Sequence, residues 1–167
     1  LDHLRDLFHA LKVPFVRLHD SHTPRPDVVD VPVVFPLFHL DAFDPRSYDF
    51  AQTDRYLQEI VDSGAQVIYR LGTSAGIKPD PPSDVDKWAD VCVQIIRHCN
   101  EGWADGLHLD IRYWEIWNEP DEGPRFWTGT MEDYLRLYEA TVLKIKDYDP
   151  DLRVGGPALA RLVKREQ

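Results

Sequence analysis

The sequence predicts an α/β fold with parallel strands, and three observations lead to this prediction. Segments with apolar residues at helical spacing alternate with short runs of β-prone residues along the 167 residues. The connections between successive β-prone runs are long enough to hold a crossover helix, as parallel strands require. No internal repeat of fixed period and no low-complexity tract breaks the alternation. We therefore expect one domain over residues 1–167.

Four helices and four strands are expected in strict alternation. The helices are predicted at residues 1–11, Ala51–Ser63, Ser83–Cys99 and Met131–Asp147. The strands are predicted at Val13–Leu18, Gln66–Leu71, Ile111–Trp117 and Leu152–Gly155. This order favours right-handed crossovers between neighbouring parallel strands.

Cap residues and apolar faces support the helix assignments. Gly64 is placed to end the second helix, and Ser83 and Thr130 each precede an Asp by three residues, a variant of the capping box. The inward face of the second helix is expected to carry Tyr56, Leu57, Ile60 and Val61. That of the last helix is expected to carry Tyr134, Leu135, Tyr138, Val142 and Ile145.

Residues 20–50 are rich in Pro and Asp and contain one short apolar run, Val31–Phe38. A connection of this length is far longer than the usual loop between a strand and a helix. Loops this long commonly form lids or walls of functional sites. We expect this segment to border the site.

Composition excludes several classes of protein. The net charge of −10 argues against nucleic-acid binding, and no window is long and apolar enough to span a membrane. Cys92 and Cys99 lie two helical turns, about 10.5 Å, apart on one predicted helix, so they are expected to be buried free thiols. No phosphate loop or serine elbow is present, and no cofactor is expected. The chain begins at Leu1 without a signal-like segment, so we expect an internal piece of a longer protein, whose compartment it does not indicate.

The most informative stretch is Arg112–Asp121, because a buried strand ends there in polar residues. Bulky, mostly β-prone residues lead up to Trp117, and Asn118-Glu119-Pro120 stops the strand. A carboxyl group and an amide thus lie side by side at the C-terminal end of a parallel strand. In α/β barrels that end carries the catalytic groups.

Trp117-Asn118-Glu119-Pro120 resembles the acid/base signature of the clan A glycoside hydrolases, which are (β/α)8 barrels. With Phe126-Trp127, Tyr134–Tyr138 and Val154–Pro157, the chain is most similar to family 39, which contains β-xylosidases and α-L-iduronidases. The resemblance implies that the chain is about half of such a barrel, from helix 1 through strand 5. A complete barrel needs about 250 residues.

The resemblance also implies roles for individual residues. Glu119 would be the acid/base of a retaining enzyme, and Asn118 would bind the sugar 2-hydroxyl. The nucleophile of the clan ends barrel strand 7, which lies outside this chain. Arg17 matches the arginine that supports the nucleophile, and His19, with the same strand parity, would line the sugar pocket. Trp127 is the best candidate for an aromatic sugar platform.

Other interpretations stay open at this point. Arg17 could also form a buried pair with Glu115, which is compatible with its role in the site, and Trp127 could be core. Arg70 departs from the carboxylate that is usual in the family. The chain could be a non-catalytic carbohydrate-binding or scaffold remnant of a barrel. The run His19-Asp20-Ser21-His22 leaves a metal-dependent barrel hydrolase as a weaker alternative. The expected partner is a carbohydrate, and an isolated half-barrel could self-associate through its open strands.

Overall fold

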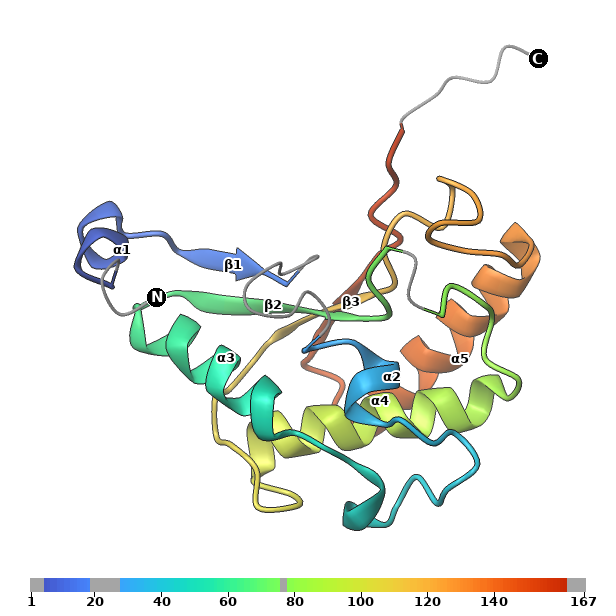
Figure 1. Ribbon diagram of the computed structural model, residues 1–167, viewed down its shortest axis with the longest axis horizontal. Helices are drawn as coiled ribbons and strands as arrows, with labels where there is room; N and C mark the ends of the chain where they lie inside the picture. The colour runs from blue at the N-terminus through green and yellow to red at the C-terminus, as the bar shows by residue number, and fades with distance from the viewer. Residues whose placement is uncertain (1–4, 19–27, 76–77, 162–167) are drawn as a thin grey trace.

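A computed structural model describes residues 5–18, 28–75 and 78–161 (Figure 1). Its sheet has four parallel strands in the order β1-β2-β3-β4. The strands are β1 (Phe15–Arg17), β2 (Gln66–Leu71), β3 (Tyr113–Ile116) and β4 (Arg153–Gly155). The strand order follows the chain order, which is the topology of consecutive strands in a (β/α)8 barrel. The predicted parallel α/β fold is confirmed.

The helices that connect the strands lie on one side of the sheet (Figure 1). The four predicted helices are α1 (Arg5–Leu11), α3 (Ala51–Asp62), α4 (Val85–Glu101) and α5 (Met131–Tyr148). Strand side chains of one parity point toward this helical layer and form the core. Tyr69 and Trp114, which are paired in register, are both buried there, with ring centroids 5.1 Å apart.

The opposite face of the sheet is partly uncovered. It carries the other parity, including Phe15, Ile68 and Tyr113, and Phe15 packs edge-on against Tyr113 with centroids 5.3 Å apart. Phe15 is 39% exposed although it lies within a strand. In a closed barrel this face is the packed interior. Its exposure here is consistent with four strands of an eight-stranded barrel.

The helix ends confirm one capping prediction and correct another. Thr130 and Asp133 form the expected reciprocal capping box of α5. The prediction of Ser83 as the cap of α4 was wrong, since the neighbouring Asp84 accepts the hydrogen bond from the Lys87 N–H. A carboxylate and a hydroxyl compete for this position, and either could have been the cap.

The inward face of α5 is also partly different from the prediction. Leu135 was expected to be inward but is 58% exposed, and the buried positions are Tyr134, Leu137, Thr141 and Ile145. The helix is therefore rotated so that Thr141, whose hydroxyl donates to the Leu137 carbonyl, faces the core. A threonine that satisfies its hydroxyl within its own helix can replace an apolar residue in the core.

The long connection after β1 contains regular structure that the sequence did not indicate. It includes the short helices α2 (Val31–Val34) and η2 (Pro45–Ser47), and it packs against β2 and α3. The Thr53 hydroxyl donates to the Val28 carbonyl at 2.5 Å, and the Tyr69 hydroxyl donates to the Val29 carbonyl at 3.1 Å. The described part of the segment, residues 28–50, therefore forms a fixed wall against β2 and α3.

The two cysteines are buried free thiols on α4, as predicted. Burial raises the pKa of both thiols, which keeps them protonated and unreactive near neutral pH. Within the described ranges, no three His, Cys, Asp or Glu side chains are grouped so that they could hold a metal ion. None of the helices in the described part of the chain is long and apolar enough to cross a membrane.

Candidate active site

The chain turns sharply where β3 ends, and this turn carries Asn118 and Glu119. The Trp117 N–H donates to the Leu71 carbonyl at 2.7 Å, so β2 and β3 end together. Both Trp117 and Glu119 have positive φ angles, +66° and +47°. The Glu119 N–H lies 3.2 Å from the Pro157 carbonyl oxygen and 3.3 Å from that of Ala158, which ties the turn to the segment after β4.

Arg17 connects the ends of β1 and β3 on the barrel-interior face. Its Nε donates to Glu115 Oε2 at 2.6 Å, and its Nη2 donates to Asn118 Oδ1 at 2.7 Å. The predicted pair of Arg17 with Glu115 is therefore present, and the same guanidinium also orients the Asn118 amide, which was not predicted. A guanidinium can hold two acceptors at fixed angles, which an ammonium cannot.

Asn118 is 2% exposed, and its Oδ1 is occupied by Arg17. Its Nδ2 is buried without a protein hydrogen-bond partner. Buried polar groups normally have partners, so this amide donor is left available to a ligand or a water molecule. The Asn118 amide can still donate hydrogen bonds.

Glu119 is half-buried, and within the described residues no hydrogen bond or ion pair occupies its carboxyl group. By contrast, Glu115, two residues before the turn, is engaged by Arg17. One carboxyl at this strand end is thus fixed as an ionic partner and the other is left uncommitted. A carboxyl group that transfers a proton must be free to hydrogen-bond with its substrate.

A buried network fixes the end of β2. Arg70 and Asp30 form an ion pair in which both side chains are fully buried, and Asp30 also accepts from the Ser74 N–H at 2.6 Å and from the Ser74 hydroxyl at 3.1 Å. Burial raises the pKa of Asp30, whereas Arg70 and the Ser74 hydrogen bonds act in the opposite direction. Arg70 is next to Glu115 in the sheet register but is paired with Asp30 instead.

Trp127 does not offer a face to solvent, so its predicted role as a sugar platform does not fit the structure. It is 3% exposed, and its Nε1 donates to the Thr130 carbonyl at 2.9 Å. Its ring packs edge-on against Trp117 and Tyr134, with centroids 4.8 and 6.0 Å away. The Gly/Pro-rich surroundings suggested an exposed loop, but the loop folds back and the indole joins the core beneath the turn.

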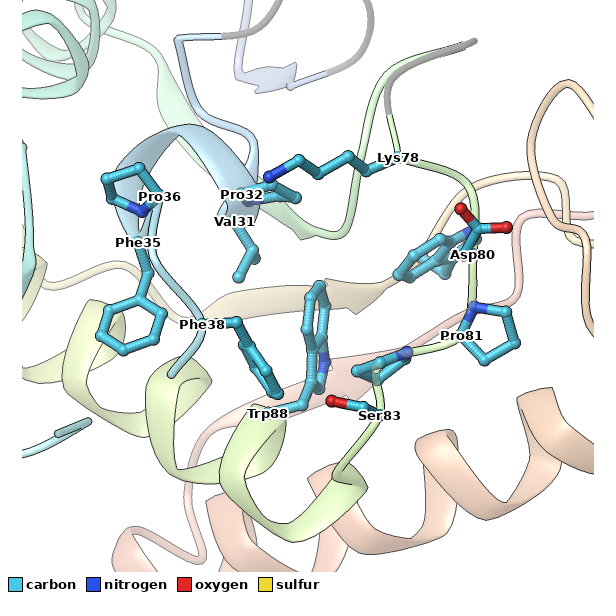
Figure 2. A pocket seen from close by; sticks show the side chains of 12 residues that line it. Val31, Pro32, Phe35, Pro36, Phe38, Lys78, Asp80, Pro81, Ser83 and Trp88 are labelled. Carbon is cyan, nitrogen blue, oxygen red and sulfur yellow. The ribbon is translucent and has the colours of Figure 1, made fainter. Parts of the chain in front are cut away.

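A pocket of about 460 Å³ lies next to the turn, between α2, the loop at residues 78–83 and the start of α4. Figure 2 shows Trp88 standing among its lining residues, with Val31 and Phe35 on the α2 side and Asp80 and Pro81 on the loop side. Trp117 also lines this pocket, so the pocket and the Asn118–Glu119 turn share one residue. The walls are mostly apolar and aromatic, with polar groups at Lys78, Asp80 and Ser83.

The structure thus brings Arg17, Asn118 and Glu119 to one edge of the sheet and assigns Trp127 to the core. His19 lies outside the described residues. Sequence reasoning missed Asp30, which holds the wall at residues 28–38 to the end of β2. Its only sequence signal is its position before Val31-Pro32, where an acidic residue can begin a helix.

Parallel strands with helices on one side, and an Asn-Glu pair at a strand C-terminus, define the chain as part of a (β/α)8 barrel of the glycoside hydrolase type. The chain belongs to glycosyl hydrolases family 39, whose family model matches residues 4–164. It is 33% identical over 107 residues to the β-xylosidase of Caldicellulosiruptor saccharolyticus and 40% identical over 82 residues to that of Geobacillus stearothermophilus. These matches cover 63% and 47% of this chain but only 20% and 16% of the two relatives.

Solved structures show the same fold. A glucosidase from Croceicoccus marinus superimposes with a TM-score of 0.84 at 29% identity, over 93% of this chain and 32% of that one. A family 39 β-xylosidase from Caulobacter crescentus gives a TM-score of 0.67 at 22% identity, over 96% of this chain and 37% of that one. The chain therefore spans about a third of the length of these enzymes.

Proposed function

We propose that this chain is the acid/base half of a retaining glycoside hydrolase, with Glu119 as the general acid and base. In the first step the Glu119 carboxyl gives its proton to the glycosidic oxygen, while a nucleophilic carboxylate forms a covalent bond to the sugar. In the second step the Glu119 carboxylate takes a proton from water, which attacks the glycosyl-enzyme. The nucleophile comes from a part of the protein outside this chain.

The uncommitted Glu119 carboxyl at a parallel strand end is the observation that carries this proposal. Asn118 supports it, because its Oδ1 is held by Arg17 and its Nδ2 is left to donate to a sugar hydroxyl. The ion pair between Arg17 and Glu115 fixes the guanidinium that orients Asn118. The substrate class follows from the relatives, two of which are named β-xylosidases, so a β-xyloside is the proposed substrate.

The test is the substitution Glu119→Ala in the full-length protein, assayed on two aryl β-xylosides. The dinitrophenyl leaving group needs little protonation, whereas the phenyl leaving group needs an acid. Glu119→Ala is expected to lower kcat/KM for the phenyl substrate by about 10²–10⁴-fold and to change it far less for the dinitrophenyl substrate. A glycosyl-enzyme should accumulate with the dinitrophenyl substrate, because its hydrolysis lacks a base.

Glu122→Gln is the matched control, because Glu122 is three residues further on and its Oε1 pairs at the surface with Arg161. It should behave as the wild type. Equal losses on both substrates in Glu119→Ala would contradict the acid/base role. A wild-type full-length protein that hydrolyses neither xylosides nor glucosides would favour the non-catalytic remnant.

A further inference from the structure

The backbone conformation of Trp117 is unusual for a large aromatic residue. Its φ of +66° lies in the left-handed region, where a residue with a Cβ is disfavoured and a bulky one is an outlier. Residues in such conformations persist only where their surroundings hold them, and they cluster at functional sites. Trp117 directly precedes Asn118 and Glu119, so the groups that hold it also aim those two side chains.

Gly72 provides the space for this conformation. A Cβ built on Gly72 would lie 3.0 Å from the Trp117 Cα and 3.5 Å from the ring atom Cε3. The end of β2 can approach the end of β3 this closely because residue 72 has no side chain. The hydrogen bond from the Trp117 N–H to the Leu71 carbonyl fixes the contact.

Described residues hold the indole of Trp117 through one hydrogen bond and two ring contacts. Its Nε1 donates to the Phe126 carbonyl at 2.8 Å, and its ring packs against Trp88 at 5.5 Å and Trp127 at 4.8 Å between centroids. The side chain is 1% exposed. Trp117 borders the pocket beside α2, and its fixed ring holds the two residues that follow it.

We propose that Trp117 is a positioning residue for the acid/base. Its buried ring, anchored to the Phe126 carbonyl and made possible by Gly72, holds the left-handed turn that directs Asn118 and Glu119 to the barrel mouth. This inference rests on the proposed function of Glu119. It makes the loop at residues 121–127 part of the catalytic geometry, because that loop supplies the anchoring carbonyl.

The test compares Trp117→Phe with Trp103→Phe in the full-length protein, on phenyl and dinitrophenyl β-xylosides. Both substitutions shrink one indole, but only Trp117→Phe removes the hydrogen bond to the Phe126 carbonyl and loosens the turn. Trp103 lies in the loop before β3, at the other end of that strand, and packs edge-on against Tyr48. A displacement near 1 Å at a catalytic group can cost about a hundredfold in rate. Trp117→Phe should therefore lower the ratio of kcat/KM for phenyl over dinitrophenyl xyloside at least about tenfold. Trp103→Phe should leave that ratio within about twofold of the wild type, by the same reasoning.

A purely structural role for Trp117 would lower the active fraction and reduce both rates equally, leaving the ratio unchanged, and that result would overturn the inference. Gly72→Ala is the second variant, since its methyl group presses on the Trp117 Cα, and it should shift the ratio in the same direction. If Glu119→Ala alters the ratio and neither Trp117→Phe nor Gly72→Ala does, only the positioning role fails. If Glu119→Ala leaves the ratio unchanged, the proposed function fails and the positioning role fails with it.

Discussion

Arg17 is the residue whose contacts join the two halves of the site. One guanidinium binds both Glu115 and Asn118, so the charge of Glu115 is balanced and the amide of Asn118 is held in one orientation. Arg17 and Glu115 are only partly exposed, at 31% and 16% of their side chains. Partial burial makes the pair harder to replace, because a lost partner leaves a charge with poor access to water.

Arg17→Lys keeps the charge, but its ammonium group cannot hold Glu115 and Asn118 in the fixed geometry of the guanidinium. We expect kcat/KM on a β-xyloside to fall by about 10–100-fold, the size of effect that loss of a precisely held contact produces. The measurement is steady-state kinetics of the full-length protein. Arg112→Lys is the control, because Arg112 pairs with Asp110 at an exposed position near the same strand. Wild-type kinetics in Arg17→Lys would show that the amide of Asn118 needs no fixed orientation.

At the scale of elements, the segment after β4 contacts the end of β3 and holds the Asn118–Glu119 turn in place. Gly156 has a φ of +135°, and a Cβ there would lie 2.7 Å from the Ile116 carbonyl oxygen and 3.2 Å from the Tyr134 hydroxyl. That same hydroxyl donates to the Ile116 carbonyl at 3.1 Å. The end of β3, α5 and the segment after β4 therefore meet at one point, where only glycine fits.

Gly156→Ala should lower the free energy of unfolding by roughly 1–3 kcal/mol, since it adds both a strained backbone conformation and a clash. Urea denaturation of the chain measures this. Gly155→Ala is a matched control, because the structure leaves open space where its Cβ would lie. Equal midpoints for the two variants would mean that the approach of Gly156 to Ile116 is not tight.

The capping box of α5 has a pH dependence that follows from Asp133. Hydrogen bonds from the Thr130 side chain and backbone, with a further one from Arg136, lower the pKa of Asp133 to about 2. A carboxyl with a lowered folded-state pKa stabilises the fold above its ordinary value near 4, and this contribution disappears as the pH falls toward 2.

The difference in urea midpoint between the wild type and Asp133→Asn should therefore be constant above about pH 5 and shrink between about pH 4 and 2. Glu132→Gln, an exposed carboxyl in the same first turn, separates the effect of charge from that of the cap. A difference that persists unchanged at about pH 2 would mean that the ionised Asp133 is not what stabilises the cap.

Many of the helices, strands and caps could be predicted from the sequence, because they depend on local periodicity. The alternation of helices and strands, the Thr130–Asp133 cap and the strand ending at Trp117 all follow from spacing and turn chemistry. The burial of Trp127, the inward rotation of Thr141 and the role of Asp30 depend on contacts with residues far away in the sequence. Asp30, for example, is held by Arg70 and Ser74, 40 and 44 positions away. The conformation of Trp117 depends on Gly72 in the same way, and no local pattern marks it.

The whole molecule has the architecture of an unclosed barrel. Within the described residues, β1 pairs only with β2 and β4 only with β3, so each has one edge without a partner. The interior face between them carries apolar side chains that remain partly exposed, including Phe15 and Tyr113. Unpaired strand edges and exposed apolar surface both favour association.

The isolated chain is accordingly expected to self-associate. Sedimentation velocity over a range of concentrations should show species larger than the 19.4 kDa monomer. Phe15→Lys, which places a charge on the open face beside the β1 edge, should shift the distribution toward monomer. A monodisperse monomer at high concentration would show that the open edges are protected in a way that the half-barrel does not explain.

The central claim, that Glu119 is the acid/base, is tested most directly by the product of azide rescue. Full-length Glu119→Ala is incubated with dinitrophenyl β-xyloside and sodium azide, which attacks the glycosyl-enzyme without a base. The acid/base role predicts faster turnover and a β-xylosyl azide, because the intermediate still forms on the opposite face of the sugar. An α-xylosyl azide would identify Glu119 as the nucleophile and contradict the assignment.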